Sequence, residues 1–198
     1  MNKSIGTVVY LYDMKAGTSR SLLLSCARDY AFRCGIEKID LTVEKNEYGK
    51  PYFPNMPDVH FSVSHSGEYW LCVFSSENIG ADIQLIRPIN AGLIIRGWYK
   101  RHEMELVKTY GLGMFFDIWA AKEAYLKYKG SGFNWFRSNV DVGEEGGIKT
   151  QIDGTRIEKV HLPLRSYTAC ICGGEGDVTV LDYRTNKDVP EPVLYYIK

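Results

Sequence analysis

The apolar positions between residues 114 and 128 recur every three or four residues. At 100° per residue this spacing places Met114, Ile118, Ala121, Tyr125 and Tyr128 on one face of a helix. Glu123 and Lys127 lie together beside that face, and Gly130, a residue type that commonly ends helices, follows. We therefore predict a helix over residues 114–129 that buries an aromatic face and carries a carboxylate and an ammonium at its edge.

Stretches rich in β-branched and aromatic residues predict strands on both sides of this helix. The expected strands span residues 5–12, 39–43, 59–64, 69–75, 79–85, 138–142, 148–153, 156–162, 167–172 and 178–183. Further helices are expected over residues 18–34, 91–98 and 100–110. Because the turns at residues 66–68 and 76–78 are short, we predict that the three strands they connect form an antiparallel meander.

The order of a strand, a helix and several strands occurs twice along the chain. This repetition predicts an α+β fold of two similar halves in a pseudo-twofold arrangement, residues 1–98 and 99–198, joined near residues 86–98. The repeat is one of element order and not of sequence. The polar, proline-bearing tail over residues 185–192 is expected to be a loosely packed extension.

Composition narrows the class of partner. Lys plus Arg and Asp plus Glu number 24 each among 198 residues, so no net charge favours nucleic acid or a membrane surface. No apolar run approaches the length of a membrane span, and we expect a cytoplasmic monomer. The five cysteines are odd in number and form no Cys-x-x-Cys pair, so we predict reduced core residues.

A few polar residues could carry chemistry, each with a plainer interpretation beside it. Asp82 and Gln84 share one face of a predicted strand, although Asp82 alone would be an ordinary strand-end carboxylate. Glu123 and Lys127 alone would be a surface pair worth roughly 0.2–0.5 kcal/mol. Arg20, in the first turn of a predicted helix, is either solvated or holds an anion at the helix N-terminus.

Four short segments, taken in order, resemble the 4′-phosphopantetheinyl transferases, specifically the longer, pseudo-dimeric type typified by the enzyme that activates surfactin synthetase. The segments are Gly49-Lys50-Pro51, Ser64-His65-Ser66, Gly80-Ala81-Asp82-Ile83-Gln84, and Trp119-Ala120-Ala121-Lys122-Glu123-Ala124 with Lys127 and Gly130. The resemblance runs from Arg20 to about Gly132 and is densest over residues 47–82. Beyond Gly132 only the general run of strands matches.

The resemblance implies a magnesium-dependent enzyme that moves the 4′-phosphopantetheine arm of coenzyme A to a serine of an apo acyl or peptidyl carrier protein. Adenosine 3′,5′-bisphosphate would be released, and the holo carrier would serve fatty-acid, polyketide or peptide synthesis. Magnesium suits this chemistry because it takes one or two protein oxygens and completes its octahedron with waters and phosphates.

The resemblance also assigns roles to residues. It implies that Asp82 and Glu123 hold the metal and that Lys127 faces phosphate oxygens. Glu123, or a water molecule on the metal beside it, would be the base for the incoming serine. By the same match, the coenzyme A contacts are Arg20, Gly49, Lys50, Pro51, Ser64, His65 and Lys127, with His65 near the 3′-phosphate. Lys122 stays open between a site residue and a solvated one, and Trp119 is expected to be core.

The chain departs from the family pattern at Gln84, where relatives usually carry Glu. We expect Gln84 to offer the metal a neutral carbonyl oxygen, with lower metal affinity or a water in its place. Two other interpretations remain: a coenzyme A-binding module without turnover, and a carrier-protein-binding factor that uses the surface of residues 100–108. The intact set of Asp82, Glu123 and Lys127 argues against both.

Overall fold

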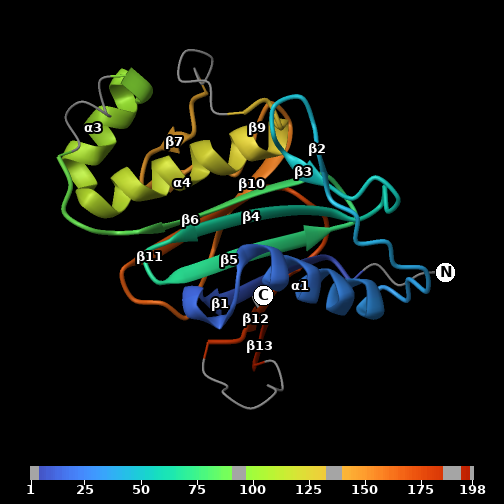
Figure 1. The fold of residues 1–198 in the computed structure, drawn as a ribbon. Helices are drawn as coiled ribbons and strands as arrows, with labels where there is room; N and C mark the ends of the chain where they lie inside the picture. Colours follow the sequence, from blue (N-terminus) through green and yellow to red (C-terminus); the bar gives the residue numbers. More distant parts are fainter. Residues whose placement is uncertain (1–4, 91–96, 133–139, 185–192, 197–198) are drawn as a thin grey trace.

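The structure, a computed structural model, describes residues 5–90, 97–132, 140–184 and, for the backbone alone, 193–196. Within these residues the protein is built from two stacked β-sheets with a long helix against the outer face of each (Figure 1). The prediction of an α+β fold is confirmed. No helix of the described residues combines the length and apolar character needed to cross a membrane.

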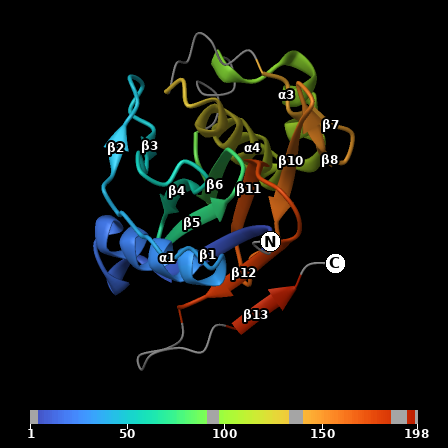
Figure 2. The ribbon, with the colours of Figure 1, turned by 90° about the vertical axis from the view of Figure 1, so that its right-hand side faces the viewer.

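The first sheet has the strand order β13-β12-β1-β5-β4. Its strands are β1 (Thr7–Asp13), β4 (His60–Ser66), β5 (Tyr69–Ser75), β12 (Val178–Asp182) and β13 (Val193–Tyr196). β1 pairs parallel with β12 and antiparallel with β5. β12 therefore lies between β1 and β13, as Figure 2 shows.

The second sheet has the strand order β6-β11-β10-β9, with antiparallel pairing throughout. It contains β6 (Ile79–Leu85), β9 (Gln151–Ile152), β10 (Thr155–Val160) and β11 (Tyr167–Gly173). Two small hairpins complete the strands: β2 (Glu44–Lys45) with β3 (Pro51–Tyr52), and β7 (Gly143–Glu144) with β8 (Gly147–Ile148).

Three helices are α1 (Ser19–Arg33), α3 (Arg101–Tyr110) and α4 (Leu112–Lys129), and a 3-10 turn (Met14–Ala16) precedes them. α1 begins as predicted, because the Thr18 hydroxyl accepts a hydrogen bond from the Ser21 amide. α4 ends at Gly130, whose left-handed backbone (φ 63°) favours glycine. The predicted helix 91–98 lies mostly outside the described residues, as does the tail over 185–192.

Strand alternation decides which side chains face which layer. In the first sheet Tyr10, Cys72 and Phe74 pack toward α1, whereas Val9 and Val73 pack toward the second sheet. In the second sheet Ala81 and Ile171 belong to the layer between the sheets, while Cys170 and Cys172 pack against α4. Asp82 is paired with Cys170 in register. Its side chain therefore lies on the face of β6 that is covered by α4.

The predicted meander of residues 59–85 is only partly correct. β4 and β5 form the expected antiparallel hairpin, but β6 does not continue it. The free edge of β5 is taken by β1, and β6 pairs instead with β11. The physical reason is that the edge of β5 can pair with only one further strand, and the buried, apolar strand β1 occupies it.

Other strand predictions also need correction. Residues 39–43 form no strand, because the Asp40 carboxylate accepts from the Thr42 amide and folds the segment into a loop. Residues 140–142, the described part of the predicted strand 138–142, are not a strand either, and residues 148–153 are divided between β8 and β9. The division into halves at residue 98 stays a prediction. β6 and β11 share one sheet, and β12 and β1 share the other.

Gly80 allows β6 to lie directly on α4. A Cβ atom at this position would be 2.1 Å from the Ala124 carbonyl oxygen and 2.2 Å from the Tyr128 amide nitrogen, which is closer than atoms can approach. Since both obstacles are helix backbone, neither can rotate away. The absence of a side chain at Gly80 therefore brings Asp82, two residues further on, next to α4.

We expect Gly80→Ala to lower the free energy of unfolding by about 1–3 kcal/mol, because overpacking against backbone forces the strand and the helix apart. Denaturant unfolding monitored by circular dichroism measures the effect. Gly113→Ala is the matched control, since nothing lies within 4 Å of a Cβ there and alanine favours the helix. Equal stabilities of the two variants would contradict the proposed close contact.

Candidate functional site

Asp82 is the buried centre of the site. Its residue is 2% exposed, and its two carboxylate oxygens accept three hydrogen bonds. Oδ1 accepts from the Ser64 hydroxyl at 2.6 Å and from the Lys127 ammonium at 2.7 Å. Oδ2 accepts from the Gln84 side-chain nitrogen at 2.8 Å. Because a carboxylate oxygen has two lone pairs, Oδ2 keeps one acceptor position that these bonds do not use.

Glu123 and Lys127 come from one face of α4, one turn apart, as the sequence predicted. Lys127 forms the ion pair with Asp82 and is 30% exposed in its side chain. Burial, and then the negative charge of Asp82, raise the pKa of Glu123 to about 7, and Lys127 opposes this shift. Two carboxylates and one ammonium thus lie close enough to interact electrostatically where β6 packs on α4.

A cavity of ≈ 280 Å³ opens beside this cluster. Among the predicted site residues, its walls include Gly49, Lys50, Pro51, Glu123 and Lys127. The remaining wall residues, most of them apolar, are Tyr48, Phe61, Ser62, Val63, Leu126, Gly130 and Gly132. The cavity therefore has an ionic end at Glu123 and Lys127 and a long apolar wall.

The loop between β2 and β3 is attached to the C-terminus of α4. The Lys50 ammonium donates to the side-chain oxygen of Asn78 (2.8 Å) and to the carbonyl oxygens of Ile79 (3.1 Å) and Tyr128 (3.3 Å). Burial lowers the pKa of Lys50 to about 8. The Asn46 amide adds a bond to the Gly130 carbonyl. A cation at the negative end of the helix dipole is electrostatically favourable, so this loop fixes the end of the helix that carries Lys127.

The other predicted contacts lie in different surroundings. His65 is exposed on β4, next in sequence to the buried Ser64. Arg20 is exposed in the first turn of α1 and is not among the residues that line the cavity. Gly49 takes a left-handed backbone conformation (φ 88°) in the loop. Gly49, Lys50 and Pro51 therefore line the same cavity as Glu123 and Lys127 of α4.

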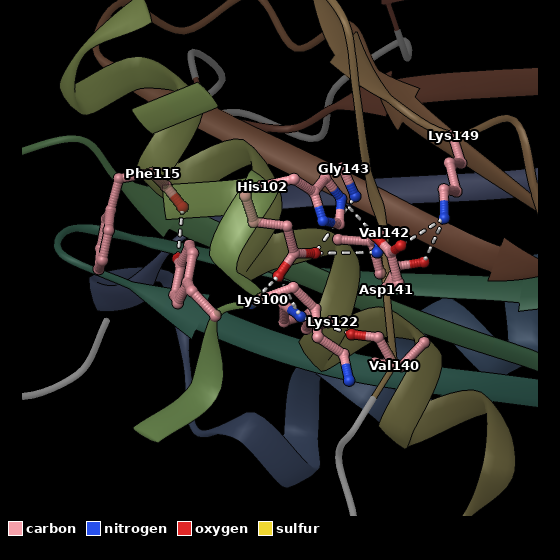
Figure 3. Close-up of polar contacts among 11 residues, drawn as sticks. Lys100, His102, Phe115, Lys122, Val140, Asp141, Val142, Gly143 and Lys149 are labelled. Atoms are coloured by element: carbon pink, nitrogen blue, oxygen red, sulfur yellow. Dashed lines mark hydrogen bonds and ion pairs between the residues drawn. The ribbon is translucent and has the colours of Figure 1, made fainter. Parts of the chain in front are cut away.

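Lys122, left open by the sequence, is fully buried. Its ammonium forms an ion pair with Glu103 of α3 at 2.7 Å and donates to the Val140 carbonyl oxygen. Glu103 is also fully buried and accepts from the amides of Lys100, Val142 and Gly143. Figure 3 shows these contacts joining α3, α4 and residues 140–143. Lys122 is a structural residue on the face of α4 that packs against α3.

The sequence interpretation missed two groups of residues. Glu103 was not singled out, although Lys100 and Glu103 have the three-residue spacing of a helix N-terminal capping box. The apolar cavity wall, which includes Phe61, Val63 and Leu126, resembles ordinary core in the sequence. No local pattern distinguishes an apolar residue that lines a cavity from one that fills a core.

The described residues contain no cluster of three or more His, Cys, Asp and Glu side chains that could hold a metal ion. Asp82 and Glu123 nevertheless fit a magnesium ion that uses two protein oxygens and several waters or phosphates. Their chemistry supports this fit, because Asp82 has an unused lone pair and the raised pKa of Glu123 reflects an unfavourable negative charge that a cation would stabilise. Gln84 turns its amide nitrogen toward Asp82.

Comparison with known proteins gives a match over the segment that carries these residues. The sequence model of the 4′-phosphopantetheinyl transferase superfamily matches residues 78–172, a segment that includes β6, α4, Asp82, Glu123 and Lys127. Over this segment the chain is similar to the 4′-phosphopantetheinyl transferase superfamily.

Individual relatives extend the match. The chain is similar to the 4′-phosphopantetheinyl transferase Sfp of Bacillus subtilis (strain 168), at 35% identity over 102 residues, which cover 50% of this chain and 46% of the relative. It is also similar to the 4′-phosphopantetheinyl transferase AcpT of Escherichia coli (strain K12), at 38% identity over 133 residues. These residues cover 64% of this chain and 63% of the relative. The chain spans about half the length of Sfp and of two further relatives from Bacillus subtilis.

Proposed function

We propose that this protein is a 4′-phosphopantetheinyl transferase that moves the phosphopantetheine arm of coenzyme A to a serine of an apo carrier protein. The observation that carries the proposal is the meeting of Asp82, Glu123 and Lys127 at the contact of β6 with α4, beside an open cavity. The named relatives support the reaction class. We also propose that the protein acts as a cytoplasmic monomer.

In the proposed reaction Glu123 accepts the proton of the carrier serine hydroxyl. Burial and the charge of Asp82 raise the pKa of Glu123 to about 7 without a cation, and a cation beside it would lower that pKa, so that the carboxylate is ionised and can accept a proton at neutral pH. The serine oxygen forms a bond to the phosphorus that carries the pantetheine arm, and the bond from that phosphorus to the bridging oxygen breaks. Adenosine 3′,5′-bisphosphate leaves, and the Lys127 ammonium stabilises the negative charge that develops on the leaving phosphate.

Asp82 and Glu123 would hold a magnesium ion, which supplies positive charge to the pyrophosphate when bound. Because Asp82 is buried, the surrounding protein screens its charge less than water would. Its attraction for a cation is therefore stronger than that of an exposed carboxylate. The Ser64 hydroxyl and the Gln84 amide orient the carboxylate before any ligand arrives.

Incubation with coenzyme A, magnesium chloride and a panel of apo acyl and peptidyl carrier proteins tests the proposal. We expect the mass of at least one carrier to increase by one phosphopantetheine group, as measured by mass spectrometry, and adenosine 3′,5′-bisphosphate to appear. Binding of coenzyme A without transfer to any carrier would instead favour a binding module. No binding and no transfer would overturn the proposal.

The exposed His65 and the half-buried Lys50 provide a test of the nucleotide end of the site. If His65 contacts the 3′-phosphate, His65→Ala should weaken coenzyme A binding by about 1.5–3 kcal/mol and leave the melting temperature unchanged, because the side chain is exposed. Lys50→Ala should weaken binding and also lower the melting temperature, because the α4 terminus loses its cation.

Calorimetric titration with coenzyme A and thermal unfolding measure both effects. Lys45→Ala, in the exposed strand β2, is the control for removal of a nearby positive charge. If neither variant changes the affinity, both residues are structural or solvated.

A further inference from the structure

Three serine side chains of β4 accept hydrogen bonds from the backbone of β6. They stand in place of the backbone-to-backbone hydrogen bonds that usually join neighbouring strands. The Ser62, Ser64 and Ser66 hydroxyl oxygens accept hydrogen bonds from the amides of Ala81 (2.9 Å), Ile83 (3.4 Å) and Leu85 (2.9 Å). Every pair is separated by 19 residues, so the two strands run parallel in a constant register. The hydroxyls therefore satisfy amides on the edge of β6 that does not pair with β11.

Ser64, the middle serine, makes one further bond. Its hydroxyl donates to Oδ1 of Asp82 at 2.6 Å, and the residue is 7% exposed. A serine has a single O–H proton, and a phosphate oxygen of a fully ionised phosphate can only accept. Ser64 can therefore donate to a nucleotide phosphate only by releasing Asp82. Its neighbour His65 is exposed and is not among the three residues that donate hydrogen bonds to Asp82.

We propose that Ser64 is a positioning residue that fixes the Asp82 carboxylate for metal binding, and not a contact of the coenzyme A phosphates. The inference rests on the proposed function. The hydroxyl of Ser64 is itself held by the Ile83 amide, so its position is set by the strand that carries Asp82. Together with the Gln84 amide on Oδ2, it fixes the plane of the carboxylate and the direction of the remaining lone pair.

The experiment compares Ser64→Ala with Ser66→Ala. Both remove a hydroxyl that accepts from a β6 amide, but only Ser64 touches Asp82. Binding of Mn²⁺ is measured by calorimetry without coenzyme A, and the KM values for coenzyme A and 3′-dephospho-coenzyme A are measured at saturating magnesium. Loss of a hydrogen-bond partner of a metal ligand typically costs 10–100-fold in metal affinity.

We expect Ser64→Ala to weaken Mn²⁺ binding about tenfold or more, and Ser66→Ala to leave it unchanged. The ratio of KM values for the two coenzyme A forms should stay at its wild-type value in both variants. Ser64→Thr, which keeps the hydroxyl, should restore most of the metal affinity. Circular dichroism establishes that each variant is folded before it is titrated.

The opposite results separate two failures. If the wild type transfers phosphopantetheine but Ser64→Ala binds Mn²⁺ normally and no longer distinguishes coenzyme A from its 3′-dephospho form, Ser64 is a phosphate contact and only this inference is overturned. If the wild type neither transfers the group nor binds Mn²⁺, the proposed function is overturned with it. An equal, tenfold loss of Mn²⁺ affinity in Ser66→Ala and Ser64→Ala would also overturn the inference. The loss would then result from removal of any hydroxyl bonded to β6, and not from the bond to Asp82.

Discussion

Asp82→Ala is expected to abolish phosphopantetheine transfer, with a loss of roughly a thousandfold or more in rate. The substitution removes a buried negative charge that the proposed metal requires, and it leaves the donors of Ser64, Gln84 and Lys127 without their acceptor. Single-turnover assays with an apo carrier identified by mass spectrometry measure the rate.

Asp82→Asn separates charge from packing, because asparagine keeps the shape of the side chain and one acceptor oxygen. We expect it to retain the fold and to lose most of the transfer rate. Asp58→Asn, at an exposed position in the loop before β4, is the control for the same chemical change. Full activity of either Asp82 variant would refute the metal assignment.

Glu103→Ala is expected to give the largest loss of stability. The substitution leaves the Lys122 ammonium buried without its carboxylate and removes the acceptor of the Val142 and Gly143 amides. Breaking one side of a buried pair costs about 3–5 kcal/mol. For a protein of this size, that loss lowers the melting temperature by roughly 6–20 °C.

Glu105→Ala is the matched control on the same helix. Glu105 pairs with Lys108 at the surface, where such a pair contributes at most about 1 kcal/mol. A double variant, Glu103→Leu with Lys122→Met, should recover part of the stability, since no charge then remains buried. Calorimetric melting of the four proteins measures these differences. If Glu103→Ala and Glu105→Ala melt alike, the buried pair contributes nothing to stability.

The sequence alone determined the elements with a strong local pattern. α4 could be predicted because its apolar positions repeat with the helical period and Gly130 ends it, and the hairpin of β4 and β5 because a short turn separates two apolar strands. The same alternation placed Asp82 and Gln84 on one face of β6. The motifs around Asp82 and Glu123 also indicated the superfamily that the comparisons support.

Only the tertiary structure decided what lies opposite these elements. Pairing of β6 with β11, and of β1 with β12, joins residues far apart in the sequence, and a strand pattern does not specify its neighbour. The environment of Lys122 was undecidable for the same reason, because its partner Glu103 lies on another helix. The hydrogen bond from Ser64 to Asp82 depends on two strands lying side by side. Local residue types fix which surfaces can be buried, whereas competition among all surfaces of the chain decides which ones meet.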